Sequence, residues 1–120
     1  MKDFRTLDVW QRSHQLTLAL YRATAGFPRD EGYGLTSQLR RAGASVPANL
    51  AEGCGRASDA DVARFLVIAL GSASELEYHL LLAHDLGYLD TAAYQHLAGE
   101  TTGVKRMLTG LLKTLRTDRR

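Results

Sequence analysis

The chain has 120 residues and a net charge of +2, with 45% hydrophobic and 23% charged residues, a balance that predicts one globular domain over residues 1–120. Its single cysteine, Cys54, excludes an internal disulfide and a metal site built from several cysteines, and it fits a protein of the reducing cytoplasm. The N-terminus lacks the apolar core of a signal peptide, and no uninterrupted apolar run approaches the ~18–20 residues that cross a membrane, so we expect neither secretion nor a membrane partner.

The first predicted helix covers about residues 7–25. Its apolar residues recur at helical spacing and form a wide stripe that includes Leu7, Trp10, Leu18 and Tyr21. The segment Gly26-Phe27-Pro28 should end this helix, because glycine favours a helix C-terminus and proline cannot continue the backbone ladder.

The second predicted helix covers about residues 35–52 and contains a proline. Its apolar face repeats at steps of three and four, at Leu35, Leu39, Ala42, Val46 and Leu50. Pro47 should cost roughly 3 kcal/mol inside a helix, since it removes one backbone hydrogen bond and crowds the carbonyl of Gly43. Because the apolar spacing continues past Pro47, we expect a kinked helix in which Ser45 takes up a freed backbone group. The alternative is two short helices, with Pro47 at the start of the second.

This helix also carries small residues and a polar stripe. The small residues, which should let another helix approach closely, are Ala42, Gly43, Ala44, Ala48 and Ala51. The stripe is formed by Gln38, Arg41, Ser45, Asn49 and Glu52. One interpretation is a solvated face. The other is a polar network between helices or between subunits, with Glu75 and Ser72 of the third helix as partners, in which a buried Arg–Glu pair would add specificity more than stability.

The third and fourth helices are predicted at about residues 59–86 and 91–115. Ser58 and Asp90 are suitable N-caps, and Gly87 should end the third helix. The core face of the fourth helix alternates steps of three and four from Tyr94 to Leu115, which predicts packing nearly parallel or antiparallel to its neighbours. Four amphipathic helices with short connections predict an all-α fold, an up-down-up-down antiparallel four-helix bundle.

Charge is distributed unevenly along the chain. Residues 1–51 have a net charge of +3, residues 52–100 of −6 and residues 101–120 of +5. The basic C-terminal segment could hold phosphates. Alternatively, Arg116, Arg119 and Arg120 complement the dipole of the last helix and keep the protein soluble.

No pattern of catalytic residues stands out, so we expect no enzyme, no cofactor and no metal. The sequence contains no Glu-x-x-His, the motif of helix bundles that bind two metals, and Glu75 with His79 would supply two ligands at best. Arg56 could lower the pKa of the Cys54 thiol. The favoured interpretation of Gly53-Cys54-Gly55, however, is a loop that simply ends the second helix. A metal-dependent enzyme is therefore the least supported class.

Most of the chain resembles a known family. The segments that carry the resemblance are FRTLDVWQ (4–11), FP (27–28), YGLTSQLRRA (33–42), SVPANLAEG (45–53), FLVIALGSASELE (65–77) and LGYL (86–89). They are similar, in order and spacing, to the 23S rRNA intervening sequence proteins, formerly called S23 ribosomal proteins. The resemblance implies a four-helix bundle that assembles as a homopentamer. It also implies structural similarity to the accessory protein of diversity-generating retroelements, which binds nucleic acid and a reverse transcriptase.

Two functions follow as expectations. In the first, a homo-oligomer binds RNA or DNA through phosphate contacts, with repeated copies of Arg40, Lys105, Arg106, Lys113 and Arg116 forming a positive belt. In the second, the assembly is a protein-interaction scaffold for a nucleic-acid enzyme or ribosome-associated factor, with Tyr33, Tyr88 and Tyr94 as candidate anchors.

Overall fold

The structure is a computed structural model that describes residues 3–118. It contains four long helices: α1 (Asp8–Thr24), α2 (Leu35–Cys54), α3 (Asp59–Asp85) and α4 (Thr91–Asp118). Two short 3-10 helices, η1 (Phe4–Thr6) and η2 (Arg29–Glu31), precede α1 and α2. The predicted all-α four-helix bundle is confirmed, with helix ends within three residues of the predicted ones.

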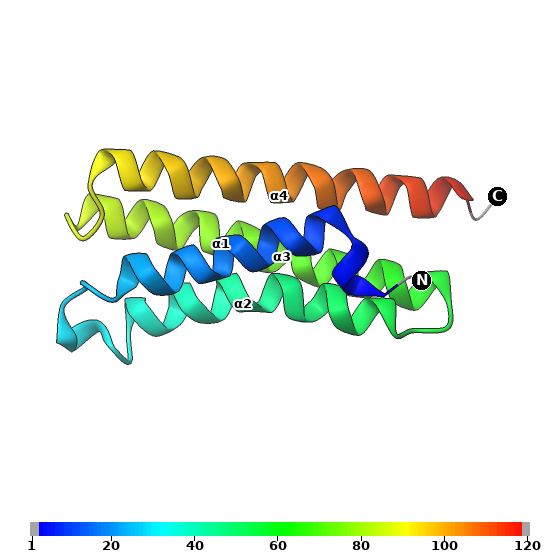
Figure 1. Cartoon of the computed structure of the whole chain (residues 1–120), viewed down its shortest axis with the longest axis horizontal. Coiled ribbons are helices and arrows are strands. Elements are labelled where there is room, and N and C mark those ends of the chain that lie inside the picture. Colours follow the sequence, from blue (N-terminus) through cyan, green and yellow to red (C-terminus); the bar gives the residue numbers. More distant parts are fainter. Residues whose placement is uncertain (1–2, 119–120) are drawn as a thin grey trace.

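The helices run alternately up and down in a bundle 49 Å long (Figure 1). Each helix packs against the next one along the chain, and α4 returns to pack against α1, with the most extensive packing between α2 and α3. The start of α1 and the end of α4 lie at the same end of the bundle (Figure 1). The core consists mainly of leucines from all four helices, among them Leu20, Leu39, Leu50, Leu66, Leu76, Leu80 and Leu108.

Local sequence signals place the ends of the helices. The Ser58 hydroxyl accepts a hydrogen bond from the Asp61 amide at 3.2 Å, and the Asp90 carboxylate accepts one from the Ala93 amide at 2.8 Å. Gly87 follows α3 with a φ of 82°, a left-handed conformation that glycine adopts without strain. The two predicted N-caps and the predicted stop after α3 are therefore confirmed.

Pro47 lies inside α2, which continues as one helix to Cys54. The alternative of two short helices is therefore wrong, whereas the kink stays a prediction. The freed backbone group is the carbonyl of Gly43, and the group that reaches it is the hydroxyl of Thr17 on α1, at 3.1 Å. Ser45 instead faces α3, so the expectation that Ser45 takes up the freed group is wrong. Thr17 is 26 residues from Gly43 in the sequence, so the spacing of residues within one helix does not predict this contact.

Helix α3 is unusually apolar for a helix with one open face. Its most apolar 18-residue window has a mean hydropathy of 1.4, enough by length and composition to cross a membrane, and 33% of that window is buried in the bundle. The sequence criterion of an uninterrupted apolar run does not detect this helix, because several polar residues between Ser72 and His79 interrupt it. Some apolar side chains of α3 are therefore not covered by the other helices and remain at the surface of the bundle.

Candidate functional site

Four basic side chains follow one face of α4. Lys105, Arg106, Lys113 and Arg116 share this face with three threonines, Thr102, Thr109 and Thr117, because the residues recur at steps of three and four. Two adjoining open hollows of ≈ 320 and ≈ 420 Å³ lie along it, and Thr109 lines both. We call Lys105, Arg106, Thr109, Lys113 and Arg116 the α4 stripe.

Three of the four cations in the α4 stripe are available to a ligand. Arg106, Lys113 and Arg116 are exposed, and within residues 3–117 their side chains form no ion pair or hydrogen bond. Lys105 is half-buried, and its ammonium lies 3.1 Å from the Glu77 carboxylate on α3. The stripe can therefore offer three free positive charges and a hydroxyl to an anion. Arg119 and Arg120 lie outside the described residues.

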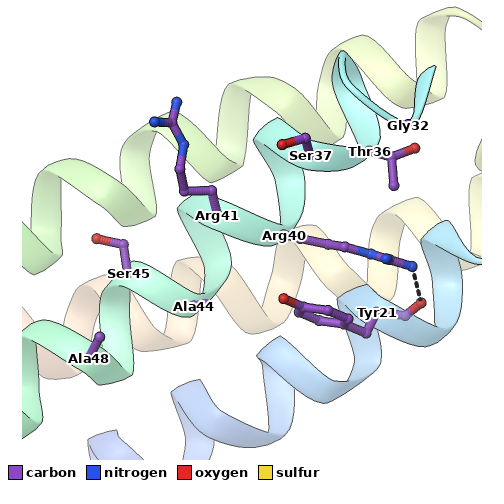
Figure 2. A pocket seen from close by; sticks show the side chains of 9 residues that line it. All are labelled: Tyr21, Gly32, Thr36, Ser37, Arg40, Arg41, Ala44, Ser45 and Ala48. Carbon is purple, nitrogen blue, oxygen red and sulfur yellow. Dashed lines mark hydrogen bonds between the residues drawn. The ribbon is translucent and has the colours of Figure 1, made fainter. Parts of the chain in front are cut away.

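Arg40, the fifth predicted phosphate-binding residue, lies on α2, away from the α4 stripe, and its side chain contacts residues of α1. It is half-buried, and its guanidinium donates to the Thr24 hydroxyl at 2.9 Å and to the Tyr21 carbonyl at 3.2 Å. The same guanidinium lies over the Tyr21 ring, 4.6 Å from its centroid (Figure 2). Arg40 therefore ties α2 to the end of α1, and the structure does not bring it together with the α4 stripe.

The polar stripe of α2 makes one direct link to α3. The hydroxyls of Ser45 and Ser72 lie 2.8 Å apart, and the Asn49 amide donates to the Ser45 carbonyl at 2.8 Å. The other members pair locally: Arg41 donates to Gln38 of the same helix at 3.2 Å, and Glu52 forms an ion pair at 2.8 Å with Arg56, which follows α2. Glu75 is exposed on α3, and no described hydrogen bond or ion pair joins it to the stripe.

An ion pair between α1 and α4 escaped the sequence analysis. The Arg12 guanidinium donates to both oxygens of Glu100, at 3.1 and 3.2 Å. This hydrogen-bonded pairing lowers the pKa of Glu100 and raises that of Arg12. Gly103 of α4 lies next to the Arg12 side chain, and a Cβ at Gly103 would collide with the Arg12 guanidinium. The partners are 88 residues apart, so no local pattern links them.

Two of the three candidate tyrosine anchors are engaged inside the bundle. The Tyr88 hydroxyl donates to Glu31 at 3.0 Å, and the Tyr94 ring stacks on His84 with centroids 4.6 Å apart. Tyr33, between η2 and α2, is fully exposed. Burial raises the pKa of the Cys54 thiol, the opposite of the lowering that Arg56 could have caused. Within the described part of the chain, no three His, Cys, Asp or Glu side chains lie together as a metal site.

Comparisons with known proteins agree with the resemblance. The model of the family "23S rRNA-intervening sequence protein" matches residues 5–110. A solved structure of a protein of unknown function from the S23 ribosomal protein family of Bacteroides thetaiotaomicron is 26% identical. The alignment covers 88% of this chain and 98% of that one, with a TM-score of 0.79. No curated protein matches the chain significantly.

Proposed function

The chain belongs to the 23S rRNA-intervening sequence protein family, and from this premise we propose that it is a non-enzymatic, homo-oligomeric protein of the cytoplasm that binds RNA or DNA through its phosphates. The single observation that supports nucleic-acid binding is the α4 stripe, where Arg106, Lys113 and Arg116 are exposed and have no acidic partner among residues 3–117. Unpaired cations repeated along one helix are the electrostatic pattern that phosphate backbones recognise.

The length of the stripe suits a contact with several phosphates. Lys105 and Arg116 are eleven residues apart, which is about 16 Å along a helix. Guanidinium and ammonium groups would pair with phosphate oxygens, and the Thr109 hydroxyl between the two hollows would add a hydrogen bond. No aromatic residue belongs to the α4 stripe, so we propose binding by charge and shape with little base recognition.

The experiment is a salt titration of binding to a structured RNA and to a DNA duplex. The test variant carries Arg106→Gln, Lys113→Gln and Arg116→Gln. The control variant carries Arg22→Gln, Arg29→Gln and Arg64→Gln, which removes the same charge from exposed positions outside the stripe. Each lost phosphate contact should reduce the slope of log K against log salt by about 0.7–0.9. The proposal would be contradicted if the salt slope fell equally in both variants, or if binding hardly depended on salt.

A second candidate function is a protein-interaction scaffold, which is favoured by the full exposure of Tyr33. Tyrosine combines a large apolar ring with a hydroxyl and is enriched at protein interfaces. The two functions separate in a pull-down with and without nuclease. Partners that survive nuclease and are lost in Tyr33→Ser support the scaffold.

A further inference from the structure

Large apolar side chains gather on the outer face of α3. Val67, Ile68, Tyr78 and Leu81 are 46, 41, 59 and 42% exposed, and we call these four residues the α3 apolar face. Gly71 lies among them, and a Cβ there would meet no atom within 4 Å, so a second helix could approach closely at this point. Several large apolar side chains exposed on one helix are costly in water and usually mark an interaction surface.

The outer face of α2 is hollowed. An open groove of ≈ 570 Å³ runs along it (Figure 2). Its floor consists of small residues, Ser37, Ala44, Ser45 and Ala48, and Arg40 and Arg41 are its basic members. Tyr21 of α1 closes one side, and we call this feature the α2 groove. Ser37, Arg41 and Ala48 are exposed, so the groove remains open in the bundle.

These two features match in length, shape and charge. From Val67 to Tyr78, and from Ser37 to Ala48, the chain advances eleven residues, about 16 Å of helix in each case. Bulky side chains project from the first feature, and small ones form the floor of the second. Glu75 lies exposed between Gly71 and Tyr78 on α3, and Arg41 lies exposed in the groove, so each side offers the charge that the other lacks.

We propose that the α3 apolar face of one copy packs into the α2 groove of a second copy of this chain. This inference rests on the proposed homo-oligomer and names the surfaces that build it. Because the two surfaces differ, a pair of copies keeps one groove free on one copy and one apolar face free on the other. Association therefore continues head to tail until the ring closes.

Two other occupants fit the α3 apolar face less well. An antiparallel pair of α3 helices centred on Gly71 would bring Glu75 against Val67 of the other copy, which buries a carboxylate without a cation. A membrane surface carries anionic headgroups, and Glu75, Glu77 and Asp85 on α3 would repel them. The α2 groove avoids both problems, because its exposed Arg41 offers a positive charge to Glu75.

A complementation experiment tests the inference by light scattering. Ile68→Glu disables the α3 apolar face, and Ala48→Trp fills the α2 groove. Each variant alone should be monomeric at concentrations where the unmodified protein assembles. A 1:1 mixture should form a dimer of twice the monomer mass, because one intact face meets one intact groove. Thr114→Glu and Thr114→Trp, at an exposed position on α4, should assemble like the unmodified protein.

A charge exchange gives a second readout. Arg41→Glu and Glu75→Arg should each weaken assembly, and the double variant should restore it. Rescue by mixing or by charge exchange also shows that the single variants are folded.

The other outcomes identify what failed. Assembly of Ala48→Trp alone would overturn the inference and leave the proposed homo-oligomer standing, since the groove would then not be the contact. A monomeric unmodified protein would overturn both. If that monomer bound anionic phospholipid vesicles and Ile68→Glu abolished the binding, the α3 apolar face would belong to a membrane contact instead.

Discussion

The hydroxyl of Thr17 on α1 lies 3.1 Å from the carbonyl oxygen of Gly43 on α2. Gly43 is four residues before Pro47, so its carbonyl is the one that the proline leaves without a helical donor. Both Thr17 and Gly43 are buried, and a buried carbonyl without a partner is costly. This contact explains how α2 keeps a proline inside a continuous helix.

Thr17→Val should lower the free energy of unfolding by about 1–3 kcal/mol, because valine keeps the shape and removes the donor to Gly43. Chemical denaturation measures the change. Thr101→Val is the matched control: both threonines are buried and donate to the carbonyl four residues earlier in their own helix, Ser13 for Thr17 and Leu97 for Thr101, but Thr17 also reaches a carbonyl on another helix. In a Pro47→Ala background, which restores a backbone donor, the cost of Thr17→Val should shrink. An unchanged cost in that background would remove the role assigned to Thr17.

Gly43→Ala should destabilise the protein by about 1–3 kcal/mol despite the better helix propensity of alanine. A Cβ at Gly43 would collide with Leu20, which is completely buried and has little room to move. Gly110→Ala is the control: no atom lies within 4 Å of its Cβ position, so thermal denaturation should show equal or higher stability there. If both variants gained stability, the close approach of α1 and α2 at Gly43 would be refuted.

Glu100→Gln should cost stability at neutral pH and progressively less in acid. The pKa of Glu100 is lowered by hydrogen bonds from Arg12, so the stabilisation is present above the ordinary value of 4.5 and is lost as the pH falls through the folded-state pKa. The pair is over a third exposed, which limits the effect to below about 1 kcal/mol. Unfolding curves from pH 7 to pH 3 measure it.

Gly103→Ala tests the same ion pair by geometry, because its Cβ would displace the Arg12 guanidinium. Its stability relative to the unmodified protein should follow the same pH dependence as that of Glu100→Gln. A difference in stability that stays constant with pH in both variants would argue against the pairing.

Arg40→Gln should affect stability and leave nucleic-acid binding unchanged. The variant loses the hydrogen bonds to Thr24 and Tyr21 and the contact with the Tyr21 ring, at a cost of about 1–2 kcal/mol. Arg106→Gln should do the opposite, with a smaller salt slope of binding and unchanged thermal stability. If Arg40→Gln instead reduced the salt slope as Arg106→Gln does, Arg40 would belong to the binding surface after all.

Regular spacing made the helices predictable, and long-range contacts limited the prediction of the site. The periods of three and four in α2 and α4 reflect the geometry of one helix, so they are readable without any partner. The α4 stripe lies on a single helix and was predictable for that reason. The roles of Arg40 and Arg12 were not, because each depends on a side chain or backbone group on another helix.

By itself, the sequence determined the four helices, the N-caps of α3 and α4, the apolar faces that drive the bundle and the family to which the chain belongs. Those features follow from backbone geometry and from apolar residues leaving water, which depend on neighbours along the chain. Only the tertiary structure decided which cations remain free, which hydroxyl meets the carbonyl opposite Pro47 and which apolar residues of α3 stay uncovered. Those outcomes depend on which helices become neighbours in space, and packing of the whole bundle sets that arrangement.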